Sequence, residues 1–335
     1  MNANTKTVLI LGAQGRLGAA AVRAFAGAGW RVRAQARRPQ PDLPAGALGL
    51  ECDAFEPDAL CRAAEGADVI VNALNAPYAD WEKSARALAE NALAAAASSG
   101  ALLMFPGNVY NFGQALPAVL RPDTPQLGDG ANARIRIDIE RGLAEAARDG
   151  VDSVVLRAGD FFGGAARGAW FDRVLTASLR KGKLVYPGQP GLAHAWAYLP
   201  DLAAAFVLLA EQRAQLRGAH SFHFAGHTLC GLDWQAEAVR LMARPIRLAA
   251  LPWGAIRLMA WFSPSMRRTL ALRYLWRRPH RLDDSALRAR LGAPPHTPLA
   301  EALAQSLRGL GLAPDASASD RGLQGYNTAD LEKRR

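Results

Sequence analysis

The sequence predicts an α/β fold that is built on a doubly wound parallel sheet. Between Thr7 and Arg157, short apolar runs alternate six times with stretches of helical pattern. Such alternation is typical of strand–helix–strand units, whose strands lie parallel. The runs are continuously apolar, as in TVLIL at Thr7–Leu11, which is expected of strands that are buried on both faces. Beyond Arg157 the alternation weakens and helical pattern dominates, so we expect a smaller, mostly helical lobe over the sheet.

Each element of the predicted sheet is bounded by residues that start or stop regular structure. Glycines at positions 29, 100 and 150 fit helix ends, and a proline at position 57 fits a helix start. The strands are expected at residues 7–11, 30–36, 48–52, 68–74, 101–105 and 153–157, and the helices between them at residues 17–28, 57–65, 78–98 and 132–148.

The second half of the chain has weaker patterns. Residues 161–168 are glycine-rich, which predicts a loop, whereas residues 170–181 and 202–211 have helical patterns. Ser221–Phe224 alternates like a strand. The polar residues after 312 show no periodicity, and we expect a mobile tail there.

The composition is that of an ordinary globular protein. Half of the 335 residues are hydrophobic and a fifth are charged. No apolar run reaches the roughly 18 residues of a membrane span, and the first residues carry no signal-peptide pattern. The three cysteines lack the spacing of a metal site, so we expect no metal and a reducing compartment. These observations together predict a cytoplasmic protein.

Positive charge is concentrated in the second half of the chain. The net charge is +10, and between Gly231 and Arg290 twelve arginines stand against four acidic residues. Such a region attracts anionic ligands, nucleic acids or membrane surfaces. The alternative is a set of solvated helix faces in an arginine-rich protein. The chain has no nucleic-acid-binding motif, so we do not expect nucleic acid as a partner.

A glycine-rich turn directly follows the first strand and opens the first helix. Its sequence is Gly12-Ala13-Gln14-Gly15-Arg16-Leu17-Gly18, with the spacing GxxGxxG. Glycines allow a tight turn whose backbone N–H groups approach a pyrophosphate, and the helix N-terminus adds positive potential. The alternative is a turn that only packs helix on strand. The residues that we expect to bind a dinucleotide are Gly12, Gln14, Gly15, Arg16, Leu17, Gly18 and, at the end of the fourth strand, Ala73.

This turn and three later segments resemble the extended and atypical short-chain dehydrogenases/reductases, which include NAD(P)-dependent epimerases and dehydratases. The segments are FPGNVYNFG at 105–113, LRAGDFFGG at 156–164 and WAYLPDLA at 196–203. The resemblance extends over residues 5–310. It implies a Rossmann-type doubly wound parallel sheet with a smaller, mostly helical C-terminal substrate lobe. Related enzymes are often homodimers, which is an argument by analogy.

The resemblance also divides the chain. Residues 1–160 are expected to form the NAD(P)-binding domain, which residues 195–225 complete. Residues 161–194 and 226–312 are expected to form the substrate lobe, with a small-molecule substrate as the partner. Residues 313–335 are the expected tail.

The end of the second strand favours NADP(H) as the cofactor. In a Rossmann-type fold a carboxylate at this point bonds the ribose hydroxyls of NAD, but this chain has Arg37 and Arg38 there. Arginine suits a 2′-phosphate, and Arg16 in the glycine turn is a further candidate contact. The alternative is that both arginines are solvated, which leaves NAD open. The resemblance implies that Asp53 meets the adenine; a helix cap is the alternative.

The catalytic pair that the resemblance implies is missing. That pair is a tyrosine acid/base and a lysine four residues later, and no tyrosine here has such a lysine. Asn132 and Arg136 stand at the two positions, and Asn108 lies where the family has a serine. Tyr110 is therefore the candidate proton donor, Asn108 a candidate partner of a substrate carbonyl, and Arg136 a candidate ribose contact. Arg136 cannot donate a proton because its pKa is too high, and ordinary packing or solvation is the alternative for Tyr110 and Arg136.

The segment His194-Ala195-Trp196-Ala197-Tyr198 places three large side chains on one face of a strand. The resemblance puts this segment beside the substrate cleft, where His194 is a candidate for proton exchange near neutral pH. A strand that packs its aromatic face on the core is the alternative. Asp160 is a candidate substrate contact or a turn cap. The apolar stretch Leu248–Pro264, with an arginine cluster after it, is interpreted as a lid, an interfacial helix, or plain core or oligomer contact.

Three functions remain open from the sequence. The first is an NADP(H)-dependent oxidoreductase or epimerase-type enzyme with a non-standard proton donor, acting on a small carbonyl, alcohol or nucleotide-sugar substrate. The second is a non-catalytic NADP(H) sensor, since the family's serine, tyrosine and lysine are all missing. The third, which ranks last, is binding of nucleic acid or a membrane surface by the arginine-rich lobe.

Overall fold

The computed structural model describes residues 6–75, 81–164 and 168–312, without the side chains of residues 81–83. The expected tail, residues 313–335, lies outside the described residues. Tyr78, at the expected start of the long helix, lies outside them as well.

The central sheet has seven parallel strands in the order β11-β7-β5-β4-β1-β2-β3. The first six in sequence are the six predicted strands, and β11 joins them at the edge beside β7. Strand β1 shows why the apolar runs form this sheet, because all five of its residues are buried. The bounds are β1 Thr7–Leu11, β2 Arg31–Ala36, β3 Ala47–Glu51, β4 Val69–Asn72, β5 Leu102–Gly107, β7 Ser153–Ala158 and β11 Ala219–Phe224.

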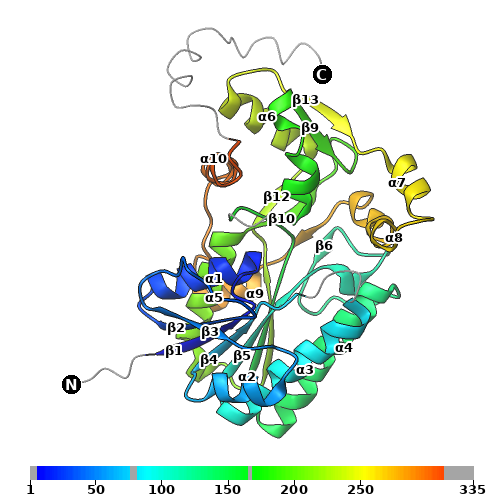
Figure 1. Ribbon diagram of the computed structural model, residues 1–335. Coiled ribbons are helices and arrows are strands. Elements are labelled where there is room, and N and C mark those ends of the chain that lie inside the picture. The colour runs from blue at the N-terminus through cyan, green and yellow to red at the C-terminus, as the bar shows by residue number, and fades with distance from the viewer. Residues whose placement is uncertain (1–5, 76–80, 165–167, 313–335) are drawn as a thin grey trace.

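Helices cover both faces of the sheet, so the doubly wound arrangement is confirmed (Figure 1). Alternate residues of β1 serve the two faces: Val8 and Ile10 belong to the cluster under α1 and α5, whereas Leu9 and Leu11 belong to the cluster under α2, α3 and α4. The helices are α1 Arg16–Gly27, α5 Leu199–Glu211 and α9 Ser285–Leu291 on the first face, and α2 Pro57–Ala64, α3 Trp81–Ser99 and α4 Ala131–Ala146 on the second.

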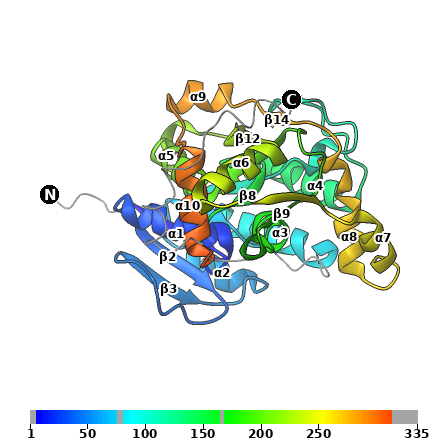
Figure 2. The same ribbon diagram turned by 90° about the horizontal axis from the view of Figure 1, so that it is seen from above.

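The small lobe lies over the carboxyl ends of the strands (Figures 1 and 2). Three small sheets form there and at its border, with the orders β12-β10-β8, β13-β9 and β14-β6. Their strands are β6 Val119–Leu120, β8 Asp160–Phe162, β9 Lys183–Tyr186, β10 His194–Tyr198, β12 His227–Leu229, β13 Arg247–Ala250 and β14 Arg281–Leu282. The helices of the lobe are α6 Gly231–Met242, α7 Trp253–Met259, α8 Pro264–Ala271 and α10 Leu299–Gly309.

Two local predictions for the lobe are wrong. The expected loop at 161–168 begins as strand β8, which pairs parallel with β10. The expected helix at 170–181 breaks into a π-helical turn at Phe171–Leu175 and a 3-10 turn at Leu179–Lys181. The wide turn closes because both the backbone N–H and the hydroxyl of Thr176 donate to the carbonyl oxygen of Phe171, at 2.9 and 3.0 Å. Tertiary packing of Phe171 on Trp234, with ring centroids 5.4 Å apart, holds it in place.

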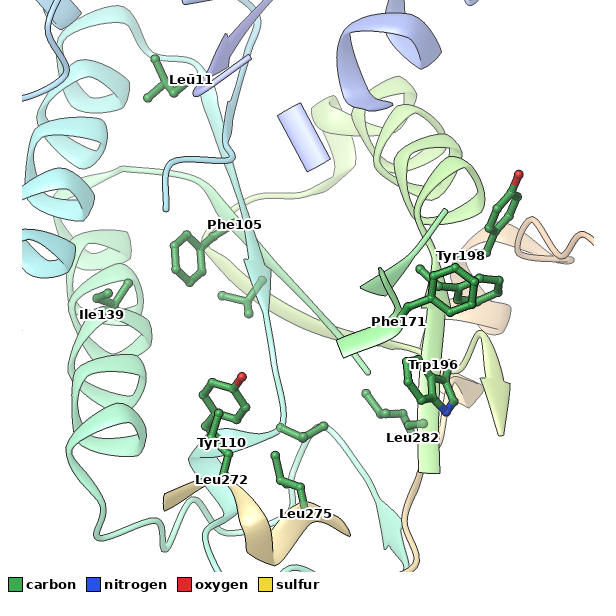
Figure 3. Packing of buried hydrophobic residues seen from close by; sticks show 14 of the residues in the cluster. Leu11, Phe105, Tyr110, Ile139, Phe171, Trp196, Tyr198, Leu272, Leu275 and Leu282 are labelled. Atoms are coloured by element: carbon green, nitrogen blue, oxygen red, sulfur yellow. The ribbon is translucent and has the colours of Figure 1, made fainter. Parts of the chain in front are cut away.

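One hydrophobic cluster runs from the sheet into the lobe. Figure 3 shows Leu11, Phe105 and Ile139 on the side of the sheet and Trp196 and Tyr198 on the side of the lobe. The lobe is therefore joined to the α2–α4 face of the sheet by continuous apolar packing. Trp196 is fully buried and packs edge-on against Trp234 at 5.3 Å, so aromatic rings fill the interior of the lobe.

Candidate active site

The turn between β1 and α1 requires glycine at positions 12 and 18. Gly12 has a φ of +72°, and a Cβ there would lie 3.0 Å from the carbonyl oxygen of Ala73. A Cβ on Gly18 would lie 2.1 Å from the carbonyl oxygen of Gly12, which no side chain allows. In the part of the chain that the structure describes, no side chain caps the N-terminus of α1 at Gly15. The turn therefore offers helix N–H groups at the carboxyl edge of the sheet, as a bound pyrophosphate needs.

A buried glutamine, which the sequence analysis missed, holds this turn in place. Gln35 accepts a hydrogen bond from the backbone N–H of Gly12 at 2.9 Å, and its amide donates to the carbonyl oxygen of Cys52 at 2.7 Å. It is 1% exposed. A polar residue inside the otherwise apolar end of β2 was the available signal, because a buried amide needs partners.

The residues expected around the adenosine end of the cofactor follow β2 and β3. Arg37 and Arg38 are exposed directly after β2. The side chain of Gln14 donates to the carbonyl oxygens of Arg38 and Pro39, each at 3.2 Å, so it ties the glycine turn to the arginine pair. Asp53 accepts from the N–H of Phe55 at 3.0 Å and so closes a turn before α2.

Two further residues expected at the cofactor serve packing around the turn. Leu17 is 5% exposed and belongs to the cluster under α1. Ala73 donates its N–H to the carbonyl oxygen of Leu11 at 3.0 Å and lies with its own carbonyl group against Gly12. Both residues therefore support the backbone of the turn by packing against it from inside the protein.

Arg16 leaves the turn and points to the small lobe. Its guanidinium donates to the carbonyl oxygens of Phe161 at 3.4 Å and Gly163 at 3.2 Å, and lies 3.7 Å from a carboxylate oxygen of Asp172. Burial lowers the pKa of Arg16, and the charges of Asp172 and Asp160 oppose that shift. Arg16 therefore links the glycine turn to the lobe, while its contact with a phosphate stays a prediction.

Asn108, Tyr110 and Arg136 gather at the carboxyl end of β5. Arg136, on α4, donates from Nη1 to the carbonyl oxygen of Pro106 at 3.1 Å and lies 5.2 Å over the ring of Phe105. The side-chain oxygen of Asn108 accepts from the N–H of Tyr110 at 2.9 Å. The structure thus brings together three of the four candidate catalytic residues.

Tyr110 is only 7% exposed and belongs to the cluster that continues into the lobe. Figure 3 shows its ring beside Leu272 and Leu275, the residues that follow α8. The residue thus packs where the strand-five loop meets the lobe, which is the position that the sequence offers as the alternative to a catalytic role, and its part as proton donor stays a prediction.

His194, the fourth candidate, lies inside the lobe at the start of β10. It is 1% exposed, and its ring stacks on Trp276 with centroids 4.0 Å apart and 1° between the planes. Its Nε2 donates to the carboxylate of Asp160 at 2.8 Å. Asp160 starts β8, and its side chain keeps 18% exposure. Asp160 comes soon after β7, the strand next to β5, whereas His194 is the first residue of β10, so their hydrogen bond links the lobe to the end of β7.

A second tyrosine, Tyr274, is close enough to Asp160 to feel the negative charge of its carboxylate. Burial and the negative charges of Asp129 and Asp160 raise the pKa of Tyr274 above its usual range. The hydroxyl of Tyr274 therefore keeps its proton at neutral pH. In the sequence Tyr274 stands out only as a possible member of a Tyr-x-x-x-Lys pair, which it does not form.

A buried network behind the site fixes α4 on the sheet. Arg157 on β7 donates to both carboxylate oxygens of Glu140 on α4, and its Nη1 lies 3.2 Å from Nε2 of His223. Nδ1 of His223 lies 3.1 Å from the carbonyl oxygen of Leu120, so Nδ1 carries the proton and Nε2 accepts from Arg157. Burial, followed by the charge of Arg157, lowers the pKa of His223 to about 4. Because α4 carries Arg136, this network positions the site.

Within residues 6–75, 81–164 and 168–312, no group of three or more His, Cys, Asp or Glu side chains is arranged to hold a metal ion. Among the same residues, no helix has the length and hydropathy to cross a bilayer.

Comparison with solved structures shows the same architecture in sugar-nucleotide enzymes. UDP-glucose 4-epimerase from Brucella ovis, solved with NAD, is 16% identical, covers 92% of this chain and 99% of its own, and has a TM-score of 0.73. UDP-glucose 4-epimerase from Thermotoga maritima, solved with UDP-glucose, is 15% identical over 91% of this chain and 98% of its own, with a TM-score of 0.71. A nucleoside-diphosphate-sugar epimerase from Pseudomonas aeruginosa is 20% identical over 92% and 99%, with a TM-score of 0.67. At these identities the likeness shows the fold.

The sequence itself carries the family assignment. No curated protein matches the chain. The model of the NAD dependent epimerase/dehydratase family matches residues 8–223, which include the glycine turn, the strand-five loop and all but the last residue of β11, and make up more than half of the chain. The protein therefore belongs to the NAD dependent epimerase/dehydratase family.

Proposed function

We propose that the protein binds NADP(H) and catalyses an oxidoreductase or epimerase-type reaction on a carbonyl, alcohol or nucleotide-sugar substrate. The observation that carries the proposal is the glycine turn, in which a Cβ on Gly18 would lie 2.1 Å from the carbonyl oxygen of Gly12. Such a cradle fits a dinucleotide pyrophosphate. The neighbours solved with NAD or with nucleotide sugars support this class of ligand.

Arg37 and Arg38 support the preference for NADP(H). Both are exposed at the end of β2, and in the described residues neither forms a salt bridge. A guanidinium there meets a 2′-phosphate favourably, whereas the position directly after the strand holds no carboxylate to bond the ribose hydroxyls of NAD. When bound, the nicotinamide supplies or accepts a hydride.

The residues at the end of β5 have separate roles in this proposal. Arg136 holds the ribose in place of the usual lysine and remains charged throughout, because a guanidinium does not exchange its proton near neutral pH. The amide N–H₂ of Asn108 bonds the substrate carbonyl, since its oxygen is occupied by the N–H of Tyr110. The hydroxyl of Tyr110 donates or accepts the proton. His194 acts through Asp160, which meets the substrate.

Calorimetric titration with NADPH and NADH tests the cofactor proposal. NADPH is expected to bind more tightly than NADH. Arg37→Ala is expected to weaken NADPH binding by about tenfold, because a hydrogen bond to a charged group contributes about 1.5–3 kcal/mol, and to leave NADH binding unchanged. Arg62→Ala, an exposed arginine on α2, is the matched control. Binding of neither nucleotide would contradict the proposal, and equal binding would replace NADP(H) by NAD.

A non-catalytic NADP(H) sensor is the second candidate. Asn132 and Arg136 at the positions of the tyrosine and lysine favour it. A panel of nucleotide sugars, ketones and alcohols separates the two functions. Turnover that Tyr110→Phe reduces by at least about a hundredfold, as loss of a general acid does, supports the enzyme. Cofactor binding without turnover of any substrate supports the sensor.

The proposal includes a cytoplasmic location and a homodimer. Cys52, Cys61 and Cys230 are free and half-buried, which agrees with a reducing compartment. Fractionation of the producing cells and light scattering of the purified protein test these two points.

A further inference from the structure

Four large apolar side chains project from the hairpin of α7 and α8. Leu258, Met259, Trp261 and Phe262 are 67%, 47%, 78% and 86% exposed, and we call them the apolar tip. Figure 2 shows α7 and α8 at one end of the molecule, remote from β3 at the other. Exposed apolar groups that gather at one place mark an interaction site, whereas single ones do not.

The hairpin that carries the apolar tip is well defined. Ile256 and Ala260 are 7% and 5% exposed and anchor its inner face. The turn is closed by backbone hydrogen bonds from Trp261 to Leu258 at 3.2 Å and from Phe262 to Met259 at 3.1 Å. The hairpin thus presents its rings outward and keeps its other face in the protein.

Arginines flank the apolar tip in the sequence. From Ala238 to Leu282 the chain has ten arginines and no acidic residue. Within the described ranges, Arg257, Arg273, Arg277 and Arg278 form no salt bridge. We call the arginines that are close to the tip in the sequence the arginine belt: Arg257, Arg267, Arg268, Arg273, Arg277 and Arg278.

The arginines of the belt also act on one another. Burial lowers the pKa of Arg273, and the like charges of Arg277 and Arg257 lower it further. The guanidinium of Arg273 lies 5.4 Å over the ring of Trp253. The belt is therefore a region of concentrated positive charge, which an anionic surface would neutralise.

We propose that the apolar tip and the arginine belt dock the protein on a bilayer surface that contains anionic lipid. Tryptophan and phenylalanine insert at the level of the lipid headgroups, and arginine guanidinium groups bond lipid phosphates. In the described residues no helix can cross a bilayer, so the contact is peripheral. The proposal is independent of the cofactor and of the reaction.

The charge of the belt argues against other occupants. A two-fold contact with a second copy would place the same patch on both sides and bring the two belts together, which like charges oppose. Nucleic acid would stack on the two aromatic rings but would leave Leu258 and Met259 in water. Anionic lipid matches both the apolar side chains and the arginines.

Vesicle flotation of the full chain tests the proposal. The probes are phosphatidylcholine vesicles with and without phosphatidylglycerol. We expect binding only with phosphatidylglycerol, and binding that weakens as salt rises. Trp261→Ser combined with Phe262→Ser is expected to weaken binding by at least about tenfold, because two buried aromatic side chains are lost. Arg277→Ser combined with Arg278→Ser is expected to weaken it by roughly 25-fold, at about fivefold for each charge near the surface.

Matched controls separate docking from general surface effects. Leu48→Ser removes an apolar side chain that is 62% exposed on β3, and Arg148→Ser removes an exposed arginine. Both are expected to leave flotation unchanged. Brominated lipid should quench the fluorescence of wild type, and Trp261→Phe should abolish that quenching while the thermal unfolding temperature stays constant.

Three results would overturn the proposal. The first is absence of binding to phosphatidylglycerol vesicles, and the second is equal binding to both kinds of vesicle. The third is evidence that the apolar tip binds a different partner. Such evidence would be a dimer that Phe262→Ser dissociates, or an oligonucleotide that the wild type binds more tightly than it binds vesicles.

Discussion

Arg157 and Glu140 form a buried ion pair that joins the end of β7 to α4. Nε of Arg157 lies 3.1 Å from Oε2 of Glu140, and the two side chains are 3% and 5% exposed. Nη1 of Arg157 also donates to the carbonyl oxygen of Pro122 and to Nε2 of His223. A pair that is fully desolvated in this way is stable only while both charges are present.

Glu140→Gln should destabilise the protein strongly. The variant keeps the shape of the side chain but leaves the guanidinium of Arg157 buried without its counter-charge, so we expect a loss of about 3–5 kcal/mol in the free energy of unfolding. Urea denaturation measures it. The control is Glu237→Gln, which breaks an exposed pair with Arg240 on α6 and should cost no more than about 1 kcal/mol. Equal losses for the two variants would contradict this account.

Acid should destabilise the fold through His223. Its pKa is about 4 in the folded chain, below the ordinary value of 6.5. The unfolded chain therefore binds the proton more readily, and stability falls as pH drops from 6.5 towards 4. Between pH 7 and pH 5 the group should remove about 2 kcal/mol.

The variant His223→Gln isolates this contribution. Glutamine can still donate to Leu120 and accept from Arg157 but does not titrate. Urea denaturation of both proteins at pH 7 and pH 5 is the measurement. The variant should lose less stability on acidification than wild type, and identical losses would assign the effect to other groups, such as His227, whose pKa burial also lowers to about 4.

Gly18→Ala should damage both the fold and the cofactor site. Its Cβ would meet the carbonyl oxygen of Gly12, and relief requires α1 to move, so we expect a loss of about 3 kcal/mol and no measurable NADPH binding. Gly27→Ala, at the other end of α1, has no atom within 4 Å of the new Cβ. It should keep NADPH binding and gain about 0.5–1 kcal/mol. Thermal unfolding and calorimetry report the two effects, and a neutral Gly18→Ala would exclude the tight turn.

Arg136→Ala should weaken NADPH binding by roughly tenfold, the effect of one charge-assisted hydrogen bond. Arg136→Lys restores the residue type that the family has at this position and should retain most of the affinity. Arg141→Ala, an exposed arginine on the same helix, is the control for effects on α4. If the alanine variants at both positions bind NADPH like wild type, Arg136 does not hold the ribose.

The sheet and the glycine turn were predictable because their causes are local. A buried parallel strand needs a continuous apolar run, and β1 is such a run. The turn needs glycine at fixed spacing, since the clash between positions 12 and 18 arises within one strand–helix unit. Such features can be recognised in a short stretch of sequence, because the residues that cause them are close together in the chain.

The rest depends on contacts between distant residues. Glu140 and Arg157 look like solvated charges in the sequence, and only the fold places them together inside the protein. The π-helical turn at Phe171 follows from packing on Trp234, which comes more than sixty residues later. His194 has the chemistry of a proton carrier, but the decision between that role and aromatic packing depends on Trp276, eighty-two residues away.

The lobe is assembled from remote parts of the chain, so it can complete its folding only late in synthesis. Strand β14 pairs with β6 across more than 150 residues, and the hydroxyl of Tyr198 donates to Gln305 on α10 at 2.7 Å. The central sheet can form on the ribosome as its strands emerge, whereas the hydroxyl of Tyr198 on β10 lacks its partner Gln305 until α10 is made. A nascent chain that is stalled before Leu299 exposes its aromatic interior, and we expect it to be a client of chaperones.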